Sequence, residues 1–193
     1  MRPLELRNCL LPICEFEAIV EKRCLKYMEA GVAHVRKYGV QAVYTKFAGP
    51  NREPGWQILQ SKPDYEGVIH GARQFIFDCK VESGASFDLG RYRDETNGPK
   101  RRQLNHMLER AEYGVRCFFL IHWNARELKK KSEQAITYAF PVHPKMPFWV
   151  AFLSGEIKSI SRHDCSELGV LIPWTLFGER DRSLQPDFIA ALR

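Results

Sequence analysis

Residues 63–80 read PDYEGVIHGARQFIFDCK and predict a β-hairpin. The first arm covers residues 66–70 and the second arm covers residues 74–82, with a Gly-containing turn between them. Because side chains of a strand alternate between two faces, Asp78 and Lys80 are expected on the same face. Asp78 directly follows three apolar residues, Phe75-Ile76-Phe77. This apolar run predicts that the second arm is a buried core strand carrying an acid and a base.

The rest of the chain alternates between helical and strand patterns. Apolar residues recur at three- and four-residue steps in residues 14–30 and 101–113, which predicts two helices. A terminal helix is also expected at residues 186–192. Runs of β-branched and apolar residues predict strands at 40–47, 86–89, 115–123 and 135–142. Gly and Pro residues predict a loop after the first of these strands. This order predicts an α/β fold with a central mixed β-sheet flanked by helices.

The composition is that of a globular protein of one domain. The chain has 193 residues, of which 45% are hydrophobic and 27% charged. We expect a single domain over residues 1–193, with a core at about 14–142 and a C-terminal extension at 143–193. Neither a membrane-spanning run nor a signal-peptide pattern is found, and no Cys-x-x-Cys pair occurs among the six cysteines. These features predict a cytoplasmic protein with reduced thiols and no membrane partner.

The hairpin also carries a pattern of catalytic residues. Asp64 is followed by 13 intervening residues and then by Asp78-Cys79-Lys80, which matches the PD-(D/E)XK pattern of nucleases. Two carboxylates at such a position can bind Mg²⁺, which prefers oxygen ligands and keeps several waters. A lysine beside them can orient the attacking water and offset charge on the phosphate. The pattern is short, so a structural interpretation is the alternative to a catalytic one. In it, Asp64 is a turn residue, and Asp78 and Lys80 form a solvated ion pair.

Basic residues gather in two segments. The net charge is +6, from 29 basic and 23 acidic residues, which favours a phosphate-rich partner. The first segment lies in residues 90–102 and supplies the candidate DNA-binding residues Arg91, Arg93, Lys100, Arg101 and Arg102. The second is Lys129-Lys130-Lys131. Each could equally be a solvated loop or helix face.

Beyond the short pattern, several anchors in one order resemble the RecU-type Holliday junction resolvases. They are Ser61-x-x-Asp64-Tyr65-x-Gly67, Gly71, Phe77-Asp78-Cys79-Lys80, Ser86-Phe87-x-Leu89, Gln103-Leu104-x-His106-Met107 and Gly114-x-x-x-Phe118. The resemblance covers about residues 15–125 and is far more specific than the PD-(D/E)XK pattern alone. It implies a restriction-endonuclease-like core.

The resemblance also implies roles for individual residues. Asp64, Asp78 and Lys80 would form the catalytic core, Gln103 would be a further metal or water contact, and Glu17 would be the matching acidic residue of the first helix. The metal ligands would be Asp64, Asp78 and Gln103, with Mg²⁺ or Mn²⁺ as the cofactor. Proteins of this family act as homodimers that nick two strands of a four-way junction, so branched DNA and a second copy are the implied partners.

The chain departs from the family pattern in ways that affect metal binding and specificity. Pro63 stands where a threonine is common, which removes a hydroxyl ligand, and Asp78 stands where a glutamate is common. The segment 40–60 is shorter than the region that enters the junction centre in the family. The alternatives are a nuclease of the same fold that acts on other branched, flap or single-stranded DNA, and a catalytically silent DNA-binding protein. Retention of Asp64, Asp78 and Lys80 argues against the silent protein.

Overall fold

A central sheet of six strands organises the computed structural model. The structure describes residues 10–38, 41–45, 55–60, 62–93, 98–127, 132–176, 184–189 and 192; of 41–45 and 55–60 it describes the backbone. The strand order is β1 (Ala33–Lys37), β4 (Tyr65–Ile69), β5 (Arg73–Glu82), β7 (Arg116–Trp123), β10 (Ile136–Val142) and β12 (Val170–Leu171). Strands β5 and β7 pair in parallel and all other neighbours are antiparallel, so the sheet is mixed. The predicted α/β architecture is confirmed.

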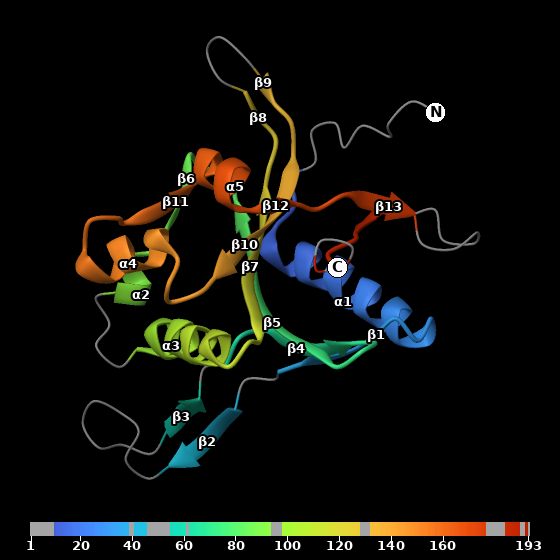
Figure 1. Ribbon diagram of the computed structural model, residues 1–193, viewed down its shortest axis with the longest axis horizontal. Coiled ribbons are helices and arrows are strands. Elements are labelled where there is room, and N and C mark those ends of the chain that lie inside the picture. The colour runs from blue at the N-terminus through green and yellow to red at the C-terminus, as the bar shows by residue number, and fades with distance from the viewer. Residues whose placement is uncertain are drawn as a thin grey trace.

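Helices cover both faces of this sheet (Figure 1). Helix α1 (Ile13–Glu29) packs on one face, where Phe16 and Val20 meet Phe77 and Leu120 in one buried cluster. Helices α3 (Pro99–Glu112), α4 (Pro147–Ser154) and α5 (Arg162–Leu168) lie on the other face, over a second buried cluster. The alternation of β5 and β7 divides their side chains between the two clusters, as the period of a strand requires. Asp78 is therefore carried by a strand that is buried on both sides.

Short ribbons and one short helix complete the described fold. The ribbons are β2 (Gln41–Thr45) with β3 (Gly55–Gln60), β6 (Ser86–Asp88) with β11 (Ser159–Ser161), β8 (Arg126–Glu127) with β9 (Ser132–Glu133), and β13 (Trp174–Leu176) with β14 (Leu184–Pro186). The β2–β3 ribbon lies outside the main sheet, and β3 contacts α3 (Figure 1). Helix α2 (Gly90–Arg93) precedes α3 in the basic segment.

The elements nearest the hairpin agree with the sequence-based expectations. The first helix, both arms of the hairpin, the short strand at 86–89, the helix before β7, and strands β7 and β10 are all present within a few residues. Strands β1 and β3 were not expected. Strand β1 pairs with β4 and β3 pairs with β2, so pairing with a neighbouring strand as well as local propensity decides their structure.

The predicted terminal helix at 186–192 is wrong over its described start. Pro186 pairs with Trp174 in the β13–β14 ribbon, and a turn follows at 188–189. Asp187 is held by an ion pair with Arg23 at 3.0 Å and by the hydroxyl of Tyr27 at 2.7 Å. These contacts to α1 hold the backbone before Asp187 in an extended conformation, which the local apolar pattern did not indicate. Residues 190, 191 and 193 lie outside the described part of the chain.

The structure also bears on membrane segments and on the state of the cysteines. No helix in the described ranges is long and apolar enough to cross a membrane. The cysteines that the structure describes are free thiols, and all but Cys14 are buried. Cys9 lies outside the described residues.

Candidate active site

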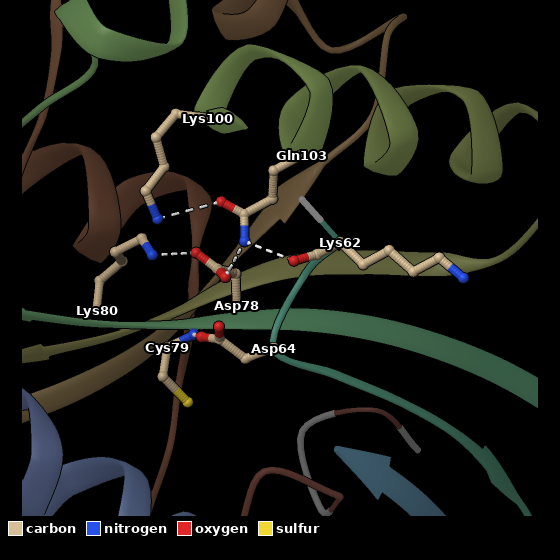
Figure 2. A network of polar contacts seen from close by, with 7 residues as sticks. All are labelled: Lys62, Asp64, Asp78, Cys79, Lys80, Lys100 and Gln103. Carbon is tan, nitrogen blue, oxygen red and sulfur yellow. Dashed lines mark hydrogen bonds and ion pairs between the residues drawn. The ribbon is translucent and has the colours of Figure 1, made fainter. Parts of the chain in front are cut away.

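The hairpin brings two aspartates to neighbouring strands. Asp64 directly precedes β4, and Tyr65 pairs with Phe77 in β5, so the next pair in the register is Asp64 with Asp78. The backbone N–H of Cys79 donates to Oδ2 of Asp64 at 2.7 Å and fixes that carboxylate beside the strand. Figure 2 shows both aspartates next to β5. The hairpin therefore brings Asp64 and Asp78, which are 14 positions apart in sequence, next to each other.

Asp78 is fully buried and lies between a lysine and an amide. The ammonium of Lys80 forms an ion pair with Oδ2 of Asp78, from two residues further along the same strand face. The side-chain amide of Gln103 donates to Oδ1 of the same carboxylate. A buried charge is tolerated only when it is paired and hydrogen-bonded, and both conditions are met here.

Gln103 is held at both ends of its amide group. It lies on the first turns of α3 and is 2% exposed. Its nitrogen also donates to the backbone carbonyl of Lys62 at 3.2 Å, and its oxygen accepts from the ammonium of Lys100 at 3.4 Å. Two acceptors on one side and one donor on the other fix the orientation of the amide (Figure 2). The nitrogen of Gln103 therefore faces the carboxylate cluster, and its oxygen faces Lys100.

The cluster perturbs the pKa values of its members. Burial, together with the negative charge of Asp78, raises the pKa of Asp64 to about 7. Burial opposes the charge of Lys80, but the neighbouring Asp78 and Asp64 outweigh it, and the pKa of this lysine is raised. Burial and the positive charge of Lys80 lower the pKa of Lys100. The site thus holds two carboxylates and two amines in one partly buried network.

The donor set of the cluster fits a divalent cation. Burial and, after it, the negative charge of Asp78 raise the pKa of Asp64, and a cation between the two carboxylates would relieve their mutual repulsion. In the described part of the chain no group of three His, Cys, Asp or Glu side chains gathers, so these two aspartates would leave most positions to water. Mg²⁺ is bound in this way in many phosphate-processing sites. Asp64 and Asp78 could therefore hold such an ion.

Glu17 is the candidate residue carried by helix α1. Helix α1 packs on the sheet face opposite to α3, and the carboxylate of Glu17 is half-exposed. The hydrogen bond of Lys37 to Glu21 at 2.9 Å, with the negative charges of Glu21, Glu17 and Asp64, raises the pKa of Lys37. Among the described residues, the side chain of Glu17 makes no hydrogen bond or ion pair with Asp64, Asp78, Lys80 or Gln103. A catalytic role for Glu17 stays a prediction.

The basic segment is partly used for contacts within the protein. Arg93 donates to the carbonyl of Gly155 at 3.4 Å and Arg101 to the carbonyl of Tyr92 at 3.2 Å. Arg102 is half-buried and Arg91 is exposed. Lys100, one of the predicted DNA-binding residues, contacts Gln103, and the DNA-binding roles of these residues stay predictions. The cluster Lys129-Lys130-Lys131 lies outside the described residues.

Two contributions to the site were missed by sequence reasoning. The carbonyl of Lys62 accepts from Gln103, and Lys100 holds the oxygen of the same amide. Lys100 precedes Gln103 by three residues on α3, which places the two side chains on one helix face, and that spacing was an available signal. The carbonyl of Lys62 had no signal, because backbone acceptors are not distinguished by residue type.

Comparisons with known proteins place this chain in a family. Among solved structures, Archaeoglobus fulgidus Hjc, described as a Holliday junction resolvase from an archaeal hyperthermophile, is 13% identical with a TM-score of 0.43, over 80% of this chain and 94% of that one. No curated protein matches the chain. The model of the family described as Recombination protein U, RecU, matches residues 14–178, which is most of the chain. The chain therefore belongs to the RecU family of Holliday junction resolvases.

Proposed function

We propose that this chain is a metal-dependent DNA endonuclease that cuts four-way junctions by paired nicks. The observation that carries the proposal is the partly buried cluster of Asp64, Asp78 and Lys80 at the β4–β5 hairpin, with Gln103 bound to Asp78. A buried cluster of this composition is costly to keep in a scaffold that only binds DNA. Membership of the RecU family supports the same reaction.

The residues of the cluster divide the work of phosphodiester hydrolysis. Asp64 and Asp78 would hold Mg²⁺ or Mn²⁺, and the ion would supply Lewis-acid activation of water and phosphate. Lys80 lies on the same strand face as Asp78, where its ammonium can donate to a phosphate oxygen and offset charge that develops during attack. Gln103 keeps the carboxylate of Asp78 in one orientation. Water adds to phosphorus and one ester oxygen departs, so each turnover nicks one strand.

Paired nicks require a second active site, which we assign to a second copy of the chain. The described residues contain one such cluster, on the hairpin of β4 and β5. A symmetric homodimer would present two equivalent clusters to two strands of a four-way junction. We expect the DNA partner to be branched and the location to be cytoplasmic, and light scattering of the purified protein with and without junction DNA tests the stoichiometry.

A cleavage assay on four substrates tests the proposed activity. The substrates are a four-way junction, a flap, a linear duplex and a single strand of shared sequence, each with Mg²⁺, with Mn²⁺ and with EDTA. We expect metal-dependent nicks in opposite strands of the junction and little product from the linear substrates. Preferred cutting of the flap or single strand would support the alternative nuclease. Binding of the junction without cutting in either metal would support the silent DNA-binding protein and overturn the proposal.

A further inference from the structure

A groove of about 330 Å³ lies between helix α3 and strands β1, β4 and β5. Residues of three neighbouring strands line the groove, and they form two rows of paired residues across the sheet. Arg36 pairs with Glu66, which pairs with Ile76, and His34 pairs with Val68, which pairs with Gln74. These side chains share one face, because Ala33 and Val35 of β1 are buried on the α1 side. From α3, Arg110 closes the groove.

The polar groups of this groove are mainly hydrogen-bond donors. The guanidinium of Arg110 is held over the strands by its hydrogen bond to Oε1 of Gln74 at 3.0 Å. Arg36 and His34 are exposed on β1. The acidic residue among the described lining is Glu66, and it accepts from the hydroxyl of Tyr38. Two guanidinium groups at the walls of one concave surface are suited to phosphate oxygens.

Lys62 connects this groove with the catalytic cluster. Its carbonyl accepts from Gln103, while its side chain points away from Asp78 (Figure 2). The ammonium lies 4.6 Å from the centre of the ring of Tyr38, whose hydroxyl reaches Glu66 in the groove. Basic groups therefore continue from the aspartates into the groove.

His106 lies on helix α3, near the basic residues Arg110 and Lys62. Burial and the positive charges of Arg110 and Lys62 lower the pKa of His106, so both cations lie near its ring. The residue stands one turn after Gln103 on α3. By contrast, Arg93 and Arg101 of the basic segment donate to carbonyls of the protein itself. The groove therefore offers cations on a concave surface next to the cluster.

We propose that this groove binds backbone phosphates of the DNA strand that enters the catalytic cluster, with Arg36 and Arg110 as the phosphate-binding residues. The inference rests on the proposed nuclease function and adds the course of the DNA to it. The carboxylate of Glu66 lies in the same groove and repels phosphates, so it limits the affinity. The groove sets binding and register, whereas the aspartates and Lys80 set the chemistry.

The salt dependence of junction binding tests the proposal. We would measure the binding constant of a four-way junction from 50 to 200 mM salt in Ca²⁺, using the full chain. Loss of two phosphate contacts in the double variant Arg36→Gln, Arg110→Gln lowers the slope of log K against log salt by about 2 units. This amounts to about a tenfold smaller loss of affinity over that range. The control is Arg73→Gln, since Arg73 is exposed on β5 but alternates to the opposite face from Gln74.

A change in the opposite direction guards against a folding defect. Glu66→Gln keeps a partner for the hydroxyl of Tyr38 and removes the negative charge, so junction binding becomes tighter. A damaged fold would not produce that gain. If the double variant matches Arg73→Gln in slope and Glu66→Gln gives no gain, the groove does not bind phosphates. If the unmodified chain neither binds nor cuts junctions, the proposed function itself fails, which is a separate outcome.

Discussion

The side-chain amide of Gln103 donates to Oδ1 of Asp78 and so links helix α3 to the central strand β5. The contact spans 25 positions of sequence and is buried. The carboxylate of Asp78 is thereby fixed from the helix side, while Lys80 fixes it from the strand side. Orientation of the catalytic carboxylate thus depends on the packing of α3 against the sheet.

Substitution of Gln103 should distinguish a donor from a metal ligand. Because the amide nitrogen faces Asp78, Gln103→Ala leaves a buried acceptor without its donor, which costs roughly 1–3 kcal/mol of stability. We expect slower cleavage for Gln103→Ala and no recovery for Gln103→Glu, since a carboxylate cannot donate. Recovery of the rate in Gln103→Glu, with a lower Mg²⁺ requirement, would instead identify residue 103 as a metal ligand. Cleavage rates measured across a Mg²⁺ titration give both quantities.

Asp78→Asn should separate DNA binding from cleavage. The amide of asparagine can still accept from Gln103, but it is a poor ligand for a divalent cation and carries no charge. We expect cleavage to be abolished and junction binding in Ca²⁺ to be unchanged or slightly tighter, because a negative charge near the phosphate is removed. Normal cutting by this variant would show that the metal is held elsewhere.

The local part of the site was predictable from sequence. Alternation along β5 places Asp78 and Lys80 on one face, and the hairpin returns Asp64 to the same position in the neighbouring strand. Both facts follow from strand geometry within a short segment. For this reason the hairpin and the aspartate contact agree with the pattern, while the catalytic roles of these residues stay predictions.

The long-range part of the site could not be read from local patterns. Gln103 was identified by the family resemblance, and its partner Lys62 contributes only a backbone carbonyl. The contact of the Arg93 guanidinium with Gly155, 62 positions away, was not indicated by sequence, and a DNA-binding role for Arg93 stays a prediction. Strand β1 owes its conformation to pairing with β4. Such contacts depend on tertiary packing, which neither composition nor periodicity contains.

Protonation of His122 should destabilise the protein in mild acid. The ring is buried, contacts Oγ1 of Thr137 at 2.8 Å and stacks on Phe16, and burial together with the charge of Arg162 lowers its pKa to about 4. The unfolded chain binds the proton near pH 6.5, so unfolding is favoured as the pH falls below that value. Stability from this group is present above pH 6.5 and is lost as the pH falls towards 4. The loss is roughly 2 kcal/mol between pH 7 and pH 5.

The pH dependence can be assigned to His122 with one variant. His122→Gln keeps a polar group for Thr137 but does not titrate in this range. Urea unfolding at pH 7 and pH 5 should therefore show a smaller fall in the free energy of unfolding for His122→Gln than for the unmodified chain. Equal falls in both proteins would place the acid sensitivity in other groups.

Gly67 should not tolerate a side chain. It lies in β4 between β1 and β5, where an added Cβ would collide with the ring of Phe75 and lie 2.7 Å from the carbonyl oxygen of His34. We expect Gly67→Ala to cost roughly 1–3 kcal/mol, the usual effect of overpacking. Gly84→Ala is the control, because its nearest contact would be 3.9 Å away. Thermal unfolding of the two variants compares them directly, and equal melting temperatures would contradict this account of the strand contact.

Lys80 should act as the counter-charge of Asp78 in the metal-free protein. The side chain of Lys80 is 14% exposed and that of Asp78 is fully buried, so Lys80→Met leaves a carboxylate without its ion-pair partner. Removal of one partner from a buried pair costs roughly 3–5 kcal/mol. A divalent cation can replace the missing charge, so Ca²⁺ should raise the melting temperature of Lys80→Met more than that of the unmodified chain. Cleavage in Mg²⁺ should nevertheless stay low, since the metal does not replace the ammonium at the phosphate.

Lys62→Met is the matched control, because the side chain of Lys62 points away from the aspartates (Figure 2). If Ca²⁺ stabilises Lys80→Met no more than Lys62→Met, Lys80 does not balance the charge of the metal site.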